Sequence, residues 1–233
     1  YKIGIHTAAE FKPLDTPEKM MDGLYQKSKE LVASGKFICM LGGEHSVSAP
    51  LIRAHSEKYH NLSVLQIDAH ADLRDTYDGT PHSHASIMAR VVKDLRIPSV
   101  QVGIRSISAD EARSLDDDLP TKIFWAKDVV GRTDWIDEAV DSLTENVYLT
   151  IDIDGLDPSL VPTTGTPEPG GLGWYETLTL IRKTAEKKRI IGMDLVEFSK
   201  TDNSDAPAFL CAKLVYKSLA YIFQNETPKV RKN

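Results

Sequence analysis

The stretch LQIDAHADLRD, residues 65–75, constrains the fold of this chain more than any other part of its sequence. An apolar run ends there, and Asp68, His70 and Asp72 follow it at alternate positions. Along an extended segment, side chains two residues apart point to the same side, so these three groups can converge. We therefore expect a buried strand that ends in a cluster of two carboxylates and an imidazole.

Short β-rich runs alternate with amphipathic stretches along the chain. The runs cover residues 37–41, 62–67, 100–104, 122–126, 147–151 and 189–195. The expected helices lie near residues 17–34, 49–58, 84–94, 109–115, 134–143, 173–187 and 207–223. This alternation predicts an α/β fold with a mostly parallel sheet and helices on both of its faces. No internal repeat or Pro/Gly-rich linker divides the sequence, so residues 1–233 are predicted to form one domain.

Charge and hydrophobic pattern argue against several classes of protein. The net charge of −6 argues mildly against a nucleic-acid partner and fits a small cationic substrate better. No apolar run approaches the ~20 residues of a membrane span, and no signal peptide opens the sequence. The two cysteines, Cys39 and Cys211, are far apart, which favours a reduced, cytoplasmic protein.

Acidic and imidazole side chains follow four of the predicted strands. In open parallel sheets, ligands bind beyond the carboxyl ends of the strands, which is where these side chains are expected. They are His45, Asp68, His70, Asp72, Asp152, Asp154, Asp194 and Glu197. A single aspartate at a strand end is most simply a helix cap. Several carboxylates at one edge, together with two histidines, instead favour a shared site.

Crowded carboxylates need a positive charge among them, because like charges this close cannot all stay ionised. Four carboxylates and two imidazoles are too many for one tetrahedral zinc ion. They suit two metal ions about 3.5–4 Å apart that share bridging carboxylates. The oxygen-rich donor set, with imidazole and no thiolate, points to manganese more than zinc. An EF-hand calcium loop is excluded, because Gly155 and Thr163 stand at the wrong positions for that motif.

Longer motifs in the sequence carry a resemblance to a known family. They are LGGEHS (41–46), IDAHADLRD (67–75), IDIDGLDPSLVPTTGTPEPGGL (151–172) and GMDLVEFS (192–199). In this order they resemble the ureohydrolases, the manganese enzymes that include arginase and agmatinase. The resemblance implies a three-layer α/β/α fold of the arginase/deacetylase type, with a parallel sheet of about eight strands. It also implies a homotrimer or homohexamer.

The start of the chain departs from the family pattern. Members usually carry several dozen residues ahead of the part that resembles YKIGIHTAAEF, and this sequence begins there. Either this sequence is truncated at its start, or the catalytic domain lacks the family's usual N-terminal segment, which normally covers the rim of the site and helps assembly.

The resemblance implies two Mn²⁺ ions per chain and a role for each ligand. The side chains that match terminal ligands are His45 with Asp72 on one ion, and His70 with Asp154 on the other. Asp68 and Asp152 match the carboxylates that bridge the two ions.

The resemblance also assigns residues that act on the substrate. His84 matches the histidine that shuttles protons, although the family usually has glycine where this chain has Ala85. His82 is the alternative for this role. Glu197 matches the carboxylate that holds the guanidinium group, and Thr166 matches a residue that lines the same pocket.

The implied reaction is hydrolysis of a small cationic guanidino compound to urea and an amine. Asp154 would accept a proton from the attacking water, whose pKa two metal ions lower toward ~7, and His84 would protonate the leaving amine. Arginases carry an asparagine at the position of Arg74, where it reads the carboxylate of the substrate. The sequences of these motifs resemble those of agmatinases more closely. Agmatine is therefore the expected substrate, and putrescine, a polyamine, is the expected product. The alternatives are arginine, another guanidino or formimino compound, and a non-catalytic binding protein on the same fold.

Overall fold

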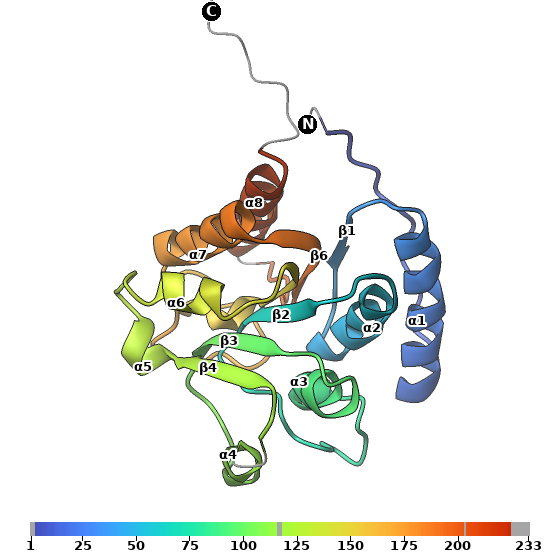
Figure 1. Ribbon diagram of the computed structural model, residues 1–233, viewed down its shortest axis with the longest axis horizontal. Coiled ribbons are helices and arrows are strands. Elements are labelled where there is room, and N and C mark those ends of the chain that lie inside the picture. The colour runs from blue at the N-terminus through green and yellow to red at the C-terminus, as the bar shows by residue number, and fades with distance from the viewer. Residues whose placement is uncertain (1–2, 116–117, 203, 225–233) are drawn as a thin grey trace, which may run out of the picture.

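A sheet of six parallel strands forms the centre of the computed structural model, which describes residues 3–115, 118–202 and 204–224 (Figure 1). The strands lie in the order β1-β6-β5-β2-β3-β4. Their bounds are β1 Ile38–Leu41, β2 Leu62–Ile67, β3 Ser99–Ile104, β4 Thr121–Trp125, β5 Asn146–Asp152 and β6 Arg189–Val196. The predicted α/β class and parallel sheet are confirmed.

The expected count of about eight strands is wrong for the described residues, which form six. Each observed strand coincides with one of the β-rich runs of the sequence. Residues 4–14, the extended segment ahead of the first helix, belong to no helix or strand. The number of strands therefore follows the strand-forming runs of this chain and not the family pattern.

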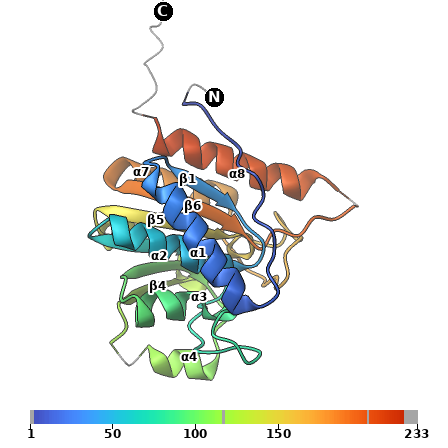
Figure 2. The same cartoon turned by 90° about the vertical axis from the view of Figure 1, so that its right-hand side faces the viewer.

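Helices cover both faces of the sheet, as Figures 1 and 2 show. The longer helices are α1 Pro17–Ala33, α2 Ser48–Lys58, α7 Trp174–Lys187 and α8 Ala206–Ile222. The shorter ones are α3 Ile87–Ala89, α4 Ala109–Ser114, α5 Ala126–Val129 and α6 Ile136–Asp141. The elements are completed by the short 3₁₀ helices η1 His45–Val47, η2 His84–Ser86 and η4 Ile153–Gly155, and by the π-helix η3 Arg90–Asp94. No helix within the described ranges is long and apolar enough to cross a membrane.

The three layers follow from the handedness of the strand connections. From β1 to β4 the chain moves across the sheet in one direction, and from β4 to β6 it moves back. Parallel connections are nearly always right-handed, so a reversal of direction places the following helices on the opposite face. One apolar cluster accordingly joins the sheet to α1, α2 and α3, and the other joins it to α6, α7 and α8.

Burial differs between the central and the outer strands. Every residue of β2 and β3 is buried, as is all of β5 except its first residue. The outer strands β1 and β4 are only partly buried. Central parallel strands covered on both faces are expected to be continuously apolar, which makes the polar residues at their carboxyl ends conspicuous.

Helix α1 begins and ends where the sequence predicts. The hydroxyl oxygen of Thr16 accepts a hydrogen bond from the backbone N–H of Lys19, and Pro17 occupies the first helical position. Gly35 follows the helix with a φ of 74°, a left-handed conformation that glycine adopts without strain. The buried residues Met21, Leu24, Ser28 and Val32 recur at helical spacing and face the core.

His55, which lies in the helix expected near residues 49–58, is buried in the core and not at the surface. Its side chain is 1% exposed and lies on the buried side of α2. The ring Nδ1 lies 2.8 Å from the carbonyl oxygen of Leu51, and the ring packs edge-on against Tyr148 with centroids 5.2 Å apart. The carbonyl of Leu51 thus gives one polar atom of the buried ring a partner.

Gly155 brings two ligand-bearing segments together. A Cβ built on Gly155 would lie 2.6 Å from the backbone nitrogen of Asp68 and 2.9 Å from its Cα. Only a residue without a side chain allows the chain after β5 to approach the end of β2 this closely.

Gly155→Ala is therefore expected to lower the stability by about 1–3 kcal/mol, because rigid backbone must move to admit the methyl group. For a chain of this length the melting temperature should fall by ~2–4 °C per kcal/mol. Gly43→Ala is the matched control, because a Cβ there meets no heavy atom within 4 Å. Equal melting temperatures for the two variants would contradict the close approach.

Candidate metal centre

The carboxyl edge of the sheet gathers the side chains that the sequence singles out. Asp68 directly follows β2, and Asp152 is the last residue of β5. His45 begins η1, just after β1, and Glu197 directly follows β6. Strands β2 and β5 are neighbours in the sheet. The chain continues from β2 to β3 on one side and from β5 to β6 on the other. Open parallel sheets bind ligands at the point where neighbouring strands diverge in this way.

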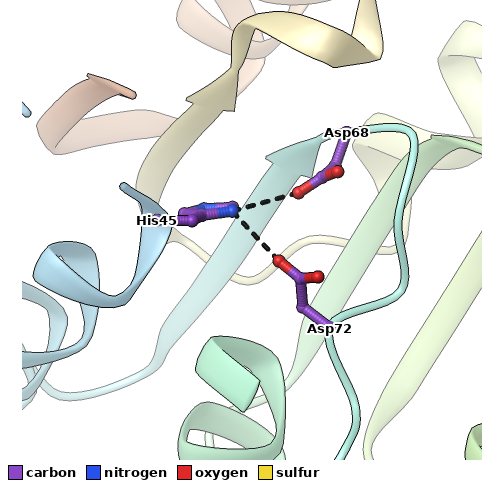
Figure 3. Close-up of side chains that lie close together, drawn as sticks. All are labelled: His45, Asp68 and Asp72. Atoms are coloured by element: carbon purple, nitrogen blue, oxygen red, sulfur yellow. Dashed lines mark ion pairs between the residues drawn. The ribbon is translucent and has the colours of Figure 1, made fainter. Parts of the chain in front are cut away.

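His45 lies at the centre of one group of carboxylates. Its Nδ1 is 3.1 Å from Asp68 Oδ2, 3.1 Å from Asp72 Oδ2 and 3.3 Å from Asp152 Oδ2. Figure 3 shows Asp68 and Asp72 pointing toward the same edge of the imidazole ring. His45 is completely buried, and its Nδ1 has no hydrogen-bond partner. An imidazole nitrogen that faces three carboxylate oxygens needs a proton or a cation between them.

A second group shares Asp68 with the first. His70 Nδ1 lies 3.0 Å from Asp154 Oδ2 and 3.7 Å from Asp68 Oδ1. Burial lowers the pKa of His70, but the adjacent carboxylates of Asp154 and Asp68 outweigh this effect and raise the pKa to about 11. Asp68 thus directs one oxygen toward each imidazole, which is the geometry of a bridging carboxylate.

The protonation of the His45 group reflects the same crowding. Burial lowers the pKa of His45, but the adjacent carboxylates of Asp152 and Asp68 outweigh it and hold the pKa well above its ordinary value. Burial and the charge of Asp68 hold the pKa of Asp72 well above its ordinary value. Burial, with the charges of Asp68 and Asp154, does the same for Asp152. Each shift comes from negative charges packed together away from water, and a cation would relieve all of them.

The donor set fits two divalent metal ions. One set is His45, Asp68 and Asp72, and the other is Asp68, His70 and Asp154. Within each set the donor atoms lie within 4.8 Å of one another. Carboxylate oxygens with one imidazole per ion are ligands that manganese accepts. Asp152 reaches the first set through Oδ2, whereas its Oδ1 accepts a hydrogen bond from the backbone of Asp154, so its role as a second bridge stays a prediction.

Backbone conformation holds two of these residues in unusual positions. Asp72 has a φ of 55° and Glu197 a φ of 63°, both in the left-handed region that residues other than glycine seldom adopt. Such strained residues persist where the surrounding structure fixes them, and they concentrate at functional sites. Here Glu197 Oε1 accepts a hydrogen bond of 2.7 Å from the backbone N–H of His45. This contact ties the end of β6 to the start of η1.

The residues predicted to act on the substrate lie around the same cluster. Glu197 is partly buried, and burial raises its pKa, while the backbone N–H of His45 and the nearby charges of His45 and His84 lower it. His84 begins η2, and its ring packs edge-on against Tyr77, with centroids 5.5 Å apart. Thr166 Oγ1 donates a hydrogen bond of 3.1 Å to Asp154 Oδ2.

His82, the alternative to His84, lies in a different environment. It lines a small cavity with Met21 and Ser46, and its charge acts on Glu18 of α1. The two histidines therefore have different neighbours: the charge of His84 lowers the pKa of Glu197, and the charge of His82 lowers that of Glu18.

The sequence reading groups Asp194 with the residues of the site, but its side chain does not join the ligand cluster. Asp194 is completely buried and accepts hydrogen bonds from the hydroxyls of Tyr148 and Thr150, at 2.8 and 2.7 Å. Thr150, which pairs with Asp194, is a residue that the sequence reading does not identify. Residues 148, 150 and 152 stand at alternate positions along β5, so their side chains point to the same side of the strand. This spacing from Asp152 is the signal that could have revealed Thr150.

Arg105 is a second residue that the sequence reading does not identify. Its guanidinium donates hydrogen bonds of 2.7 Å to the backbone carbonyls of Asp154 and Glu168, and one of 3.0 Å to Gly103. These hydrogen bonds hold the segments around Asp154 and Glu168, which both follow β5, against the end of β3. An arginine directly after the apolar run 100–104 is the signal that could have revealed it.

The chain is similar to known proteins over nearly all of its length. Residues 1–220 match the arginase family. The N(1)-aminopropylagmatine ureohydrolase of Synechocystis is 37% identical over 238 residues, which covers 99% of this chain and 77% of that protein. The agmatinase of Bacillus anthracis is 34% identical over 218 residues, which covers 89% of this chain and 71% of that protein.

A solved structure has the same fold. The agmatine ureohydrolase of Thermoplasma volcanium superimposes with a TM-score of 0.81 at 30% sequence identity. The superposition covers 94% of this chain and 74% of that one.

Metal analysis of the protein saturated with MnCl₂ should find two ions per chain. Asp68→Ala should lose both ions, because Asp68 faces both imidazoles, whereas His45→Ala should weaken mainly one. Asp75→Ala is the matched control, since this carboxylate pairs with Lys93 at 2.8 Å and lies outside both sets. Full occupancy in Asp68→Ala would contradict the site.

Proposed function

Because the chain belongs to the arginase family and is a ureohydrolase, we propose that it hydrolyses agmatine to putrescine and urea with two Mn²⁺ ions bound per chain. The observation that carries this proposal is the paired ligand cluster with Asp68 between His45 and His70. An intact ligand set also favours an enzyme over a binding protein that has lost turnover. Two bound ions would lower the pKa of a water molecule, which could then attack the guanidino carbon at neutral pH.

The contacts of Asp154 support a role in accepting the proton of the attacking water. Its Oδ2 faces His70 at 3.0 Å and accepts the hydroxyl hydrogen of Thr166. Its Oδ1 accepts a hydrogen bond of 3.1 Å from the backbone of Ala69, so the carboxylate is held from both sides. We assign Asp154 as the group that accepts this proton, and Thr166 as the residue that orients it and lines the pocket.

Glu197 and His84 act on the guanidinium group and on the leaving amine. One oxygen of Glu197 is fixed by the backbone of His45, which leaves the other to accept charge-assisted hydrogen bonds from the substrate. An alkyl amine leaves only when it is protonated, and a histidine can carry that proton near neutral pH. The influence of His84 on the pKa of Glu197 supports its assignment to this role over His82.

The contacts of Arg74 favour a substrate without a carboxylate. Arg74 stands where arginases carry the asparagine that reads this group. Here its Nε lies 3.5 Å from Glu111 Oε2, and its guanidinium lies 4.9 Å from the centre of the Tyr77 ring. The positive charge of Arg74 is therefore already matched within the chain, and so a carboxylate would gain little from it.

A second candidate substrate is N(1)-aminopropylagmatine, which extends agmatine at its amine end. The 37% identity to the Synechocystis enzyme of that name favours it. Both candidates present a guanidinium group and no carboxylate, so they share the chemistry proposed for the buried end of the site. For the assembly, we propose a homotrimer or homohexamer, which the exposed aromatic residues Phe209 and Tyr216 of α8 support.

His84→Ala should keep both metal ions but lower the kcat for agmatine by about 10²–10⁴-fold, because the leaving amine loses its proton donor. Added imidazole should restore part of the rate. Urea release measures both effects. His82→Ala is the matched control and should keep near-native turnover, since His82 faces α1. The opposite pattern would transfer the role to His82.

Agmatine should exceed arginine in kcat/KM by at least ~10-fold, because an unpaired buried carboxylate costs about 1–3 kcal/mol. The same urea assay with N(1)-aminopropylagmatine decides between the two candidates. A higher kcat/KM for the aminopropyl compound would make it the substrate. An arginine rate equal to both would overturn the argument from Arg74.

A further inference from the structure

The two nitrogens of the His45 ring have different partners. Nδ1 faces the carboxylates of the metal centre, whereas Nε2 points away from them and lies 2.9 Å from Thr150 Oγ1. Behind Thr150 lies Asp194, and all three side chains are completely buried. The imidazole is therefore held between the metal centre and a polar network inside the sheet.

The hydrogens of this network can be assigned one by one. The hydroxyl of Thr150 has a single hydrogen, which it donates to Asp194 Oδ1 at 2.7 Å. The other oxygen of Asp194 accepts the hydroxyl hydrogen of Tyr148 at 2.8 Å. Thr150 can then only accept from His45, so Nε2 carries a hydrogen. A neutral imidazole with its hydrogen on Nε2 presents a lone pair at Nδ1, which is the form that binds a metal.

We propose that Thr150 and Asp194 are positioning residues that fix His45 in its metal-binding tautomer and orientation. Partners of this kind behind a metal-bound histidine raise metal affinity and hold the ring in place. This inference concerns the assembly of the metal centre and goes beyond the proposed substrate and reaction.

Within the described part of the chain, no side chain supports the imidazole of His70 in the same way. The nearest carboxylate to His70 Nε2 is that of Glu168, at 4.0 Å, which is beyond hydrogen-bond distance. The side chains of His70 and Glu168 are 24% and 38% exposed, so water reaches this side of the ring. Loss of the Thr150 hydroxyl should therefore weaken one metal ion and not both.

Titration of the metal-free protein with MnCl₂ tests the proposal, with unbound Mn²⁺ counted by its electron paramagnetic resonance signal. Thr150→Val keeps the shape of the side chain and removes the hydroxyl. It should weaken one of the two ions by about 10–100-fold and leave the other near its native affinity. Thr150→Ser keeps the hydroxyl and should bind both ions as the native chain does. Thr150→Ala, which also lacks the hydroxyl, replaces the valine variant if that one does not fold.

Thr184→Val is the matched control for the loss of a buried hydroxyl. Thr184 is completely buried in α7, and its Oγ1 donates a hydrogen bond of 2.8 Å to the carbonyl of Leu180, away from the site. It should lower the melting temperature but not the metal affinity. Native affinity in Thr150→Val, or equal losses in Thr150→Val and Thr150→Ser, would overturn the proposal. The titration contains no substrate, so its result is independent of whether agmatine is hydrolysed.

Discussion

Buried carboxylates that pair with no lysine or arginine side chain of the described residues are the main constraint on this structure. Asp68, Asp72, Asp152 and Asp154 are each at most 4% exposed and converge on the imidazoles of His45 and His70. Burial of so much negative charge is costly unless positive charge lies among the oxygens. Arg74 pairs with Glu111, and the guanidinium of Arg105 bonds backbone carbonyls and not these carboxylates. Two divalent cations would supply this positive charge. In a ureohydrolase reaction the same charge would lower the pKa of the attacking water.

The sheet makes this arrangement possible by supplying the stability that the site lacks. Its central strands are buried on both faces by two apolar clusters, one on each side. Gly155 lets the chain after β5 lie against the end of β2, and Glu197 joins the end of β6 to the start of η1. Four segments far apart in the sequence are thereby held within hydrogen-bond distance of one another. The strained backbone at Asp72 and Glu197 is tolerated because its neighbours are rigid.

Much of the fold and the ligand cluster could be predicted from the sequence, because strand and helix periods are local signals. The alternate positions of Asp68, His70 and Asp72 are visible in a few letters, as are the caps of α1. What could not be predicted depends on tertiary packing. His55 reads as a polar helix residue until the carbonyl of Leu51 and the ring of Tyr148 enclose it. Asp194 shares a strand end with Glu197 but points into the core, and only the pairing of β5 with β6 brings it to Thr150. The strand count was overestimated because it came from the family pattern and not from the runs in this chain.

Anomalous X-ray diffraction at the manganese edge, from crystals of the Mn²⁺-loaded protein, tests the central claim most directly. The account predicts two peaks about 3.5–4 Å apart. One should lie against Nδ1 of His45 and the other against Nδ1 of His70, with one oxygen of Asp68 on each. A single peak between the two imidazoles, or no peak beside Asp68, would contradict a binuclear centre built on this shared carboxylate.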